Sequence, residues 1–557
     1  MKKSIFTLII TLLCFFPKAQ NEFITTWKPS NNHYILPNNP PFPSSATQAW
    51  APFRGTDFTI YWEEVGYPAH NSTLNNVTSQ YQVLLDFGTP FNPVPDNATY
   101  TVKVSNGNGN FHRVAFRESD LGNSLSSGMG DFSKIVEINN WGTAVWSSMH
   151  NAFNGCLYLN MIATDSPNLS MVTDMSYMFS GCSSMTGTNS INNWDTSTVT
   201  TLQGTFTSCM LFNQPIGNWN TSNVESMGAM FLMCQNFNQP IGNWDTSKVT
   251  AMDAMFNNAR TFNQPIGNWN VASVDEMEFM FSNAWAFNQP IGNWNTSGVW
   301  QMNYMFLNAK AFNQPIGSWD TSSATAMHGM FQNATVFNQP IGNWNTSNVT
   351  TMNTMFQNAS AFNQNIGSWN TSQVTTMQNM FTGAAGFNQS LGNWNLSSLL
   401  YASGMFQNSG LNCQNYDSTL YGWSQNPATP NNINISSASP MIYTHPAAVI
   451  ARNYLISNKS WTITGDSYDD KCMSALSTHE NILEGDFGFY PNPASDFIYF
   501  KNLKNGVSYR IFDSSGRLVL ENVLEKNQID IRNLAKGNYI IQIVSKNTVK
   551  SLKIVKN

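Results

Sequence analysis

The sequence predicts an α/β repeat solenoid of about eleven 25-residue coils, with an N-terminal β-rich cap and a C-terminal antiparallel β-sandwich. Three observations lead to this prediction. A sequence motif that begins with Phe-Asn-Gln recurs with a period of 25 residues through the middle of the chain. The segments on either side alternate apolar and polar residues, which is typical of β-strands. At 557 residues, the chain is too long for one ordinary hydrophobic core.

Residues 1–20 are predicted to be a signal peptide. Lys2 and Lys3 precede an apolar run from Ile5 to Phe16, and a polar break follows. A run of about 12 residues is too short to cross a bilayer but has the length of a signal-peptide core. We expect cleavage after Gln20; the alternative is a buried N-terminal helix. Since no other stretch is long and apolar enough for a membrane span, the mature chain is expected to be exported without one.

Residues 21–131 are predicted to form a β-rich region that caps the first coil. Runs such as "FTIYWEEVGY" and "ATYTVKVSNGNGNFHRVAF" alternate apolar and polar side chains, as half-buried strands do. The two glycines of "NGNGN" lie between such runs and do not open a helix, so a hairpin turn is expected there rather than a phosphate-binding loop.

Residues 132–411 contain the repeat. In each well-preserved copy, Gly lies five residues after the first Phe, Trp lies seven residues after it, and a Met-Phe pair ends twelve residues after the Trp. These copies begin at Phe212, Phe237, Phe262, Phe287, Phe312, Phe337, Phe362 and Phe387. Less perfect copies surround Trp141, Met175 and Trp194. Such regularity predicts stacked units that bury Val, Met, Phe, Ile and Trp against one another, because one unit cannot bury its own apolar face.

Each coil is predicted to contain one short helix and one brief strand. Asn/Asp-Thr-Ser after the Trp is a good N-cap signal, and Ser222 to Glu225 completes a capping box. Val349, Met352, Phe356 and Ala359 then follow at helical spacing. The segment "FNQPIGNW" is expected to return the chain through a strand and a turn, with its Asn and Gln side chains pairing between coils. The Met and aromatic stripe is interpreted as core rather than as a cofactor site.

The repeat resembles the bacterial BspA-type leucine-rich-repeat surface proteins. The shared pattern is Phe-Asn-Gln-x-Ile-Gly-x-Trp-(Asp/Asn)-Thr-Ser-x-Val-x-x-Met-x-x-Met-Phe-x-x-Ala, over about half of the chain. "FITTW" (Phe23–Trp27) resembles the start of such proteins. "NYDSTLYGW" (Asn415–Trp423) and "AAVIARNYLI" (Ala447–Ile456) resemble their end, so residues 412–473 are expected to cap the last coil. The resemblance implies a leucine-rich-repeat-like solenoid on the cell surface that attaches to proteins, cells or matrix; it implies no catalytic residues.

Residues 488–557 are predicted to be a separate β-sandwich, joined through a linker at 474–487. The resemblance here is to the C-terminal sorting domain of the type IX secretion system of Bacteroidetes. The residues that carry it are Pro491, Asn492, Pro493, Gly516, Arg517, Gly537 and Tyr539. It implies translocation across the outer membrane by the type IX machinery, cleavage near the domain boundary, and surface attachment or release. A generic β-sandwich binding module is the alternative.

The charge distribution argues against a nucleic-acid partner. Only 10% of residues are charged, and the formal net charge is −6. Residues 488–557 hold 11 Lys and Arg against 5 Asp and Glu, while the rest of the mature chain holds 12 basic and 27 acidic residues and is therefore acidic. Binding to phosphates needs clustered Lys and Arg, so nucleic acid is not an expected partner.

Six cysteines remain after the predicted cleavage. One set occupies a single repeat column in consecutive coils: Cys156, Cys182, Cys209 and Cys234. Later coils mostly carry Ala in that column, so a small buried side chain explains it; disulfides between adjacent coils stay open for an exported protein. Cys413 and Cys472, which bracket the predicted terminal cap, form the other candidate pair.

Columns that vary between coils are the candidate ligand-binding positions. Phe279 and Tyr304 share one column in adjacent coils, and Trp300 is expected to lie near Tyr304 at i,i+4. Another column holds Arg260, Trp285 and Lys310, an arrangement that suits cation–π stacking. Asp275, Glu276 and Glu278 add local acidity. These residues predict a site for an extracellular protein or glycan; the alternative is that they pack as additional core.

The sequence therefore predicts a non-enzymatic secreted or cell-surface protein that acts in adhesion or in protein or glycan binding. No metal-ligand spacing, nucleophile motif or phosphate loop is present in the sequence, so no cofactor, metal or catalytic residue is expected. The alternatives are a structural spacer or surface-layer component without a specific ligand and, less favoured, an exported hydrolase, which would need two carboxylates about 5–10 Å apart.

Overall fold

The computed structural model describes residues 21–31, 44–118, 127–474, 488–501, 507–524, 526–545 and 548–557. The predicted signal peptide, 1–20, and nearly all of the predicted linker, 474–487, lie outside these residues. The chain divides into two compact units, Met1–Lys248 and Val249–Asn557, which are described in turn.

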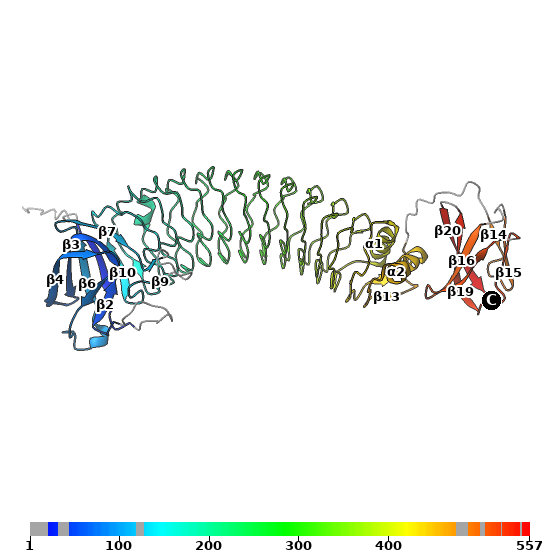
Figure 1. Ribbon diagram of the computed structural model, residues 1–557, viewed down its shortest axis with the longest axis horizontal. Coiled ribbons are helices and arrows are strands. Elements are labelled where there is room, and N and C mark those ends of the chain that lie inside the picture. Colours follow the sequence, from blue (N-terminus) through cyan, green and yellow to red (C-terminus); the bar gives the residue numbers. More distant parts are fainter. Residues whose placement is uncertain are drawn as a thin grey trace, which may run out of the picture. The chain divides into compact units, whose positions relative to one another are not determined.

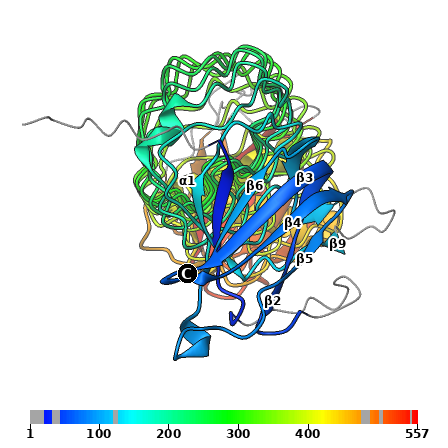
Figure 2. The same ribbon diagram turned by 90° about the vertical axis from the view of Figure 1, so that its left-hand side faces the viewer.

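A seven-stranded sheet begins the first unit (Figures 1 and 2). The strand order is β11–β10–β1–β6–β3–β4, and β7 also pairs with β3. The strands are β1 (Phe23–Trp27), β3 (Phe53–Glu64), β4 (Tyr67–Ser79), β6 (Tyr100–Ser105), β7 (Asn110–Val114), β10 (Ile135–Asn140) and β11 (Asn160–Met161). Smaller elements are β2 (Gln48–Ala51) paired with β5 (Val83–Asp86), β8 (Arg117–Glu118) paired with β9 (Ser127–Gly128), and the 3-10 turns η1 (Pro95–Asn97) and η2 (Asn189–Asn193). Figure 2 shows the long strands β3, β4 and β6 side by side.

The core of this sheet continues into the first coils. The ring of Phe23 in β1 lies 5.7 Å from that of Phe111, 5.9 Å from Trp141 and 5.1 Å from Trp146, between centroids. β10 lies within the segment predicted to be repeat, yet it pairs antiparallel with β1 and parallel with β11. β10 therefore joins the antiparallel sheet to the parallel stacking of the coils.

The coils of the first unit are joined by backbone hydrogen bonds from each coil to the next. The amide of Phe153 donates to the Met178 carbonyl (2.8 Å), and the amide of Phe206 donates to the Met230 carbonyl (3.0 Å). Parallel bridges run from Asp174 to Thr201 and on to Ser226. The sequence repeat is thus also a repeat of hydrogen bonding.

The second unit repeats this pattern more regularly, and Figure 1 shows its coils as successive loops side by side. In the coil that begins at Phe337, the amides of Met352, Thr354, Phe356 and Asn358 donate to carbonyls of the following coil at 2.7–3.0 Å. One parallel bridge per coil runs down the stack, through Ala251, Glu276, Gln301, Ala326, Thr351, Thr376 and Tyr401.

The predicted helix in each coil is wrong. Residues 350–361 form an isolated bridge and a series of turns. Their alternate amides donate to the next coil, so they are not available for i→i−4 bonds within a helix. Thr354 and Asn358 also have φ values of 51° and 57°, in the left-handed region that a right-handed helix excludes.

The predicted capping box is instead a polar turn. The amide of Ser222 donates to Asn220 Oδ1 (3.1 Å), as in an Asx turn. The amide of Glu225 donates to the Thr200 carbonyl of the preceding coil (2.7 Å). Asn or Asp before Thr-Ser therefore specifies a turn after the Trp rather than the start of a helix.

The recurring apolar residues fill the inside of the stack as predicted. Trp344 and Trp369 lie parallel with their centroids 6.4 Å apart, and Phe331 and Phe356 lie 5.7 Å apart. The indole Nε1 of Trp344 donates to the Ile316 carbonyl at 3.1 Å. This bond satisfies the buried indole N–H and gives the Ile316 carbonyl a donor that a Phe or Leu could not supply.

Asn and Gln form the side-chain ladders that the sequence suggests. The Gln339 Nε2 donates to both the carbonyl and the Oδ1 of Asn313, at 3.0 Å each. The amide of Asn338 donates to the same Oδ1 at 2.9 Å. Each Asn side chain thereby satisfies the polar groups of the next coil.

Two helices cover the last coil of the second unit: α1 (Cys413–Gln425) and α2 (Pro446–Lys459), which contact each other. The strands β12 (Ile442–Tyr443) and β13 (Ser467–Tyr468) pair in parallel beside them. Trp423 in α1 donates its Nε1 to the Leu391 carbonyl (2.9 Å), as the coil Trp residues do. Helix α1 therefore continues the core of the stack while closing it.

Residues 488–557 form two antiparallel sheets around one core. Their orders are β14–β15–β18 and β17–β16–β19–β20. The strands are β14 (Phe489–Tyr490), β15 (Phe497–Phe500), β16 (Ser508–Asp513), β17 (Leu518–Val523), β18 (Gln528–Asp530), β19 (Gly537–Ser545) and β20 (Thr548–Lys556). Ile498 and Ile529 of the first sheet share a buried cluster with Ile511, Ile541 and Ile554 of the second. Among the described residues, no helix is long and apolar enough to cross a membrane.

Candidate functional site

The four cysteines of the repeat column are free and buried, so the inter-coil disulfides left open by the sequence are not formed. Each of the last three thiols bonds to a Phe carbonyl: Cys182 to Phe153, Cys209 to Phe179 and Cys234 to Phe206, at 2.8–3.2 Å. Burial raises the pKa of the thiols of Cys156, Cys182, Cys209 and Cys234. They act as small core residues, in the place that Ala takes in later coils.

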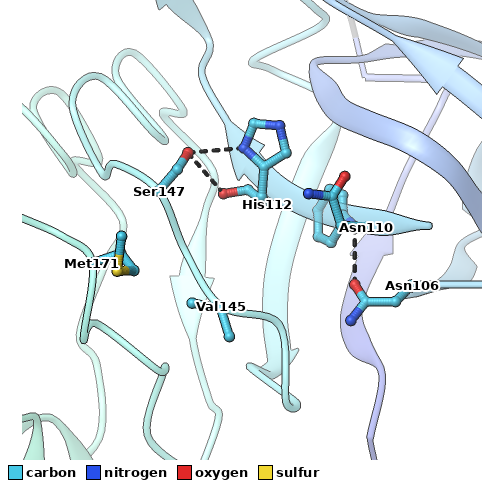
Figure 3. A pocket seen from close by; sticks show the side chains of 7 residues that line it. Asn106, Asn110, His112, Val145, Ser147 and Met171 are labelled. Carbon is cyan, nitrogen blue, oxygen red and sulfur yellow. Dashed lines mark hydrogen bonds between the residues drawn. The ribbon is translucent and has the colours of Figure 1, made fainter.

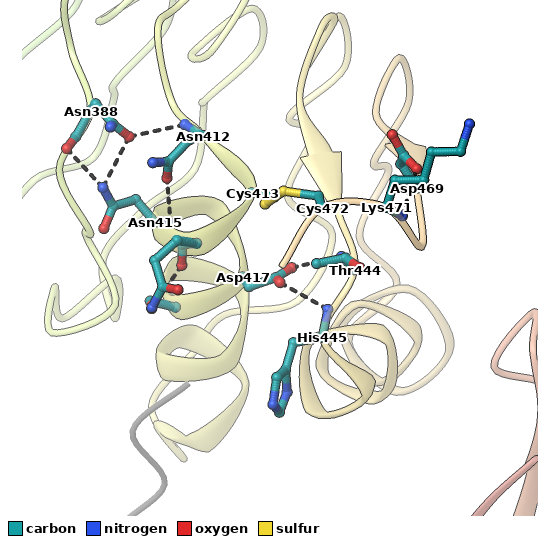
Figure 4. The surroundings of a disulfide bond; sticks show 12 residues. Asn388, Asn412, Cys413, Asn415, Asp417, Thr444, His445, Asp469, Lys471 and Cys472 are labelled. Carbon is teal, nitrogen blue, oxygen red and sulfur yellow. Dashed lines mark hydrogen bonds between the residues drawn. A yellow bond between two sulfur atoms is a disulfide. The ribbon is translucent and has the colours of Figure 1, made fainter. Parts of the chain in front are cut away.

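Cys413 and Cys472 form a disulfide in the terminal cap (Figure 4). It ties the first residue of α1 to the segment after β13. Next to it, the buried carboxylate of Asp417 accepts hydrogen bonds from the amides of Thr444 (3.1 Å) and His445 (2.9 Å). Burial raises the pKa of Asp417, although these bonds oppose the shift. The carboxylate thus joins α1 to the start of α2, and the bridge joins α1 to the segment after β13.

The predicted cation–π column is present in the second unit, and we call it the cation stack. Arg260 Cζ lies 4.2 Å and Lys310 Nζ 4.5 Å from the centroid of the Trp285 ring. The indole is therefore held between two cations from the coils on either side, and it is 38% exposed. Three residues at 25-residue spacing thus form one surface feature.

A second column contributes Phe279 and Tyr304 to an aromatic ladder, which His328 of the preceding column completes. The Phe279 and Tyr304 rings stack with centroids 4.8 Å apart and planes at 11°. The Tyr304 hydroxyl lies 2.6 Å from His328 Nε2. Burial lowers the pKa of His328, which favours the neutral ring that accepts this hydrogen bond. His328 was not among the predicted site residues, because it stands in the column before that of Tyr304.

Phe279 and Tyr304 have unusual backbone conformations. Their φ values are 58° and 54°, in a region that bulky residues rarely adopt. The same column holds Ala254, Gly329 and Thr354 in neighbouring coils. Aromatic residues are therefore a departure from the repeat that its backbone does not favour, and such departures are often associated with function.

Gly329 makes room for the ladder. Tyr304 leans over the next coil, where a Cβ at residue 329 would lie 2.5 Å from the ring atoms Cδ1 and Cε1. In the first unit, Tyr177 leans over Gly204 in the same way, with a distance of 2.4 Å. A tyrosine that leans over the following coil in this way therefore requires glycine there, whereas Phe279 is followed by Tyr304 and stacks on its ring.

We expect Gly329→Ala to lower the free energy of unfolding by more than the roughly 1–2 kcal/mol of the left-handed conformation alone. The additional cost is the contact of the new methyl group with the Tyr304 ring. Urea denaturation of Gly329→Ala in the parent and in a Tyr304→Ala background separates the two parts. The substitution should cost less in the second background; an equal cost in both would contradict the proposed steric role of Tyr304.

An acidic group lies beside the aromatic ladder in the second unit. It consists of Asp253, Glu276 and Glu278. Burial and then the charges of Glu276 and Asp253 raise the pKa of Glu278, so the three carboxylates repel one another. Glu278 immediately precedes Phe279, and its charge contributes to the raised pKa of Tyr304, after burial. Glu276 and Glu278 were predicted from the sequence to add acidity here, whereas Asp253, which shares a repeat column with Glu278, was not. Asp275 is exposed in the adjacent column.

Trp300 is 39% exposed, but the predicted i,i+4 pairing with Tyr304 is wrong. Residues 300–304 form the bridge and a turn rather than a helix. The Trp300 amide donates to the Asp275 carbonyl at 3.0 Å. Trp300 is therefore an exposed aromatic residue just before the bridge of its coil.

A cavity of about 360 Å³ lies in the first unit (Figure 3). Its lining residues are Asn106, Asn110, Phe111, His112, Val145, Ser147 and Met171. His112 Nδ1 lies 2.8 Å from the Ser147 hydroxyl. The two side chains are therefore paired as the Ser and His of a serine hydrolase are, where a carboxylate also orients the His ring. The His112 pKa is lowered by burial and by Arg113 and Arg54; no carboxylate contributes to the shift. None of the lining residues is an Asp or Glu that could orient the ring and stabilise its protonated form.

The residues of the predicted sorting motif lie at turns and strand ends of residues 488–557. Pro491, Asn492 and Pro493 follow β14, and Asn492 Oδ1 accepts from the Val555 amide at 2.8 Å. Gly516 has a φ of 80° in the β16–β17 turn, beside an Arg517–Asp513 ion pair of 3.0 Å. Gly537 begins β19, and the Tyr539 hydroxyl donates to the Ala535 carbonyl at 2.8 Å. Each part of the motif thus fixes the shape of the β-domain.

The molecule thus consists of stacked coils followed by a β-domain, and family models match both parts. A family described as a Mycoplasma protein of unknown function, DUF285, matches residues 147–250, 173–290, 232–341 and 314–419. A secretion system C-terminal sorting domain matches residues 488–557. No curated protein matches the chain.

The sorting domain implies that the type IX secretion machinery handles this chain, and it points to a secreted surface protein of a Bacteroidetes-type bacterium. The described residues contain no cluster of His, Cys, Asp or Glu that could hold a metal ion.

Proposed function

We propose that this protein is a non-enzymatic surface adhesin that binds an extracellular protein or glycan. In this proposal the coils are a leucine-rich-repeat-like solenoid of the BspA type, and the sorting domain delivers them to the cell surface. The observation that carries the proposal is the grouping of exposed or half-exposed aromatic and charged side chains between residues 253 and 328, at positions where other coils carry small or polar residues.

The columns of the repeat differ in what they contribute to stability. The apolar columns that recur from coil to coil are buried, and backbone amides of the repeat make hydrogen bonds between coils. Trp285 and Trp300 lie outside those columns, and they are 38% and 39% exposed. Exposed Trp is enriched where proteins bind partners, because it offers a large apolar surface together with a polar edge.

The spacer alternative makes a different prediction for the same residues. A spacer needs length and stability, and coils such as those from Phe337 to Ala385 provide both without aromatic departures. In a spacer, the clusters between residues 253 and 328 would have no ligand. An enzyme would need a set of reacting groups, and the His112–Ser147 pair without its carboxylate does not supply one.

An array of glycans and extracellular-matrix proteins, probed with the full mature chain, tests the proposal. The parent is expected to bind at least one class of ligand, and Trp285→Thr/Trp300→Thr is expected to lose that binding. Thr occupies the same columns at residues 335 and 325, so the variant should fold. The control is Leu400→Thr/Tyr401→Thr, which removes side chains that are 60% and 58% exposed in another coil. A folded parent that binds nothing on the array would contradict the proposal and favour the spacer.

A further inference from the structure

One face of the aromatic ladder is left uncovered in the second unit. Phe279 stacks on Tyr304 on the side of the following coil. On the side of the preceding coil, the same column holds Ala254, whose methyl group is too small to cover a phenyl ring. Phe279 is accordingly only half-buried. The ladder ends in a ring with one open face.

Three negatively charged residues lie beside this ring. Asp253 lies in the coil of Ala254, Glu278 is the neighbour of Phe279, and Glu276 stands at the bridge. All three are half-buried, and in the described part of the chain none of them forms an ion pair with a Lys or Arg. The Asn303 side chain hydrogen-bonds to Glu278, which leaves the negative charge in place. A cation at this position would relieve the mutual repulsion of the carboxylates.

The chemistry favours an organic cation over a metal ion. An aromatic face attracts ammonium and guanidinium groups, and carboxylates accept their hydrogen bonds. Among the described residues, no group of His, Cys, Asp or Glu is placed so that it could hold a metal ion, and this includes the three carboxylates. An extended cation that spans a ring and several carboxylates fits this arrangement better.

We propose that the open face of Phe279, together with Asp253, Glu276 and Glu278, binds a lysine or arginine side chain of a basic partner protein. This inference rests on the proposed binding function and deepens it, because it names the chemistry of the partner at one site. The chain itself uses the same recognition nearby, where Trp285 is held between Arg260 and Lys310. In the ladder the aromatic ring belongs to this chain and the cation comes from the partner.

The test uses fluorescently labelled nona-arginine and nona-lysine peptides, with nona-glutamate as the negative probe, and the full mature chain. Fluorescence anisotropy at physiological salt measures the dissociation constant. Glu278→Asn and Phe279→Ala are the test variants, and both residues occur in the same columns of adjacent coils, at Asn303 and Ala254. Each is expected to weaken binding of the cationic peptides by about 5–10-fold.

The matched control is Asp320→Asn, which removes one negative charge in a column that holds Asn in the coils on both sides. It should change the dissociation constant by less than about twofold, because screening limits a distant charge. Equal weakening by Asp320→Asn and Glu278→Asn, or unchanged binding in Phe279→Ala, would overturn the proposed site. If the parent binds a glycan or protein on the array but not the cationic peptides, this inference fails while the proposed function stands; silence on both contradicts both.

Discussion

Trp344→Ala is expected to lower the free energy of unfolding by about 3–5 kcal/mol. The substitution removes a buried ring that lies parallel to Trp369 at 6.4 Å, and it leaves a cavity in the stack. It also leaves the Ile316 carbonyl without the indole N–H that donates to it at 3.1 Å. Urea denaturation, followed by circular dichroism, measures the loss.

Asn343→Ala, at the exposed neighbouring position, is the control and should change stability by less than about 0.5 kcal/mol. Because stacked coils can unfold in parts, hydrogen exchange of the coils on either side should be measured as well. Faster exchange is expected to be greatest in the coils next to Trp344. A cost below about 1 kcal/mol, with unchanged exchange, would contradict the account of the Trp column as core.

Loss of the Cys413–Cys472 bridge is the second large effect. The bridge closes a loop with a sequence separation of 59 residues, for which the chain-entropy model gives a stabilisation of about 4 kcal/mol. Cys413→Ser/Cys472→Ser is therefore expected to lower the free energy of unfolding by about 2–5 kcal/mol. The loss should appear first in α1 and the last coil, where Trp423 bonds to the Leu391 carbonyl.

A reductant provides the control for this prediction. The four cysteines of the repeat column are free, so dithiothreitol has one described disulfide to act on. It should lower the melting temperature of the parent and leave that of the double variant unchanged. A parent whose melting temperature does not respond to the reductant would contradict a stabilising role of the bridge.

The stacking residues of the fold could be predicted from the sequence, but the backbone of each coil could not. The 25-residue period identifies Trp344, Met352 and Phe356 as core residues, because burial explains a column that holds a large apolar side chain from coil to coil. The helix was predicted wrongly because Asn-Thr-Ser specifies an Asx turn as well as an N-cap. What decides between them is the donation of alternate amides, such as that of Met352 to Thr376, to the next coil. The sequence alone does not show which carbonyl of the next coil each of these amides bonds to.

Those parts of the candidate site whose residues share a repeat column could be predicted from the sequence. Arg260, Trp285 and Lys310 could be grouped because they are 25 residues apart, and they stack in the structure. The contact of Tyr304 with His328 joins two different columns, and the need for Gly329 depends on the direction in which the ring leans. Both depend on side-chain direction, which the spacing of residues does not reveal.

The central claim is that the departures from the repeat bind the ligand while the repeat itself is scaffold. The most direct test replaces the departures by residues that neighbouring coils carry and returns the full mature chain to the array. The substitutions are Arg260→Thr, Phe279→Ala, Trp285→Thr, Trp300→Thr, Tyr304→Ala and Lys310→Thr. The account predicts a chain that keeps the melting temperature of the parent within a few degrees and loses its ligand. A variant that folds and still binds as the parent does would contradict the claim.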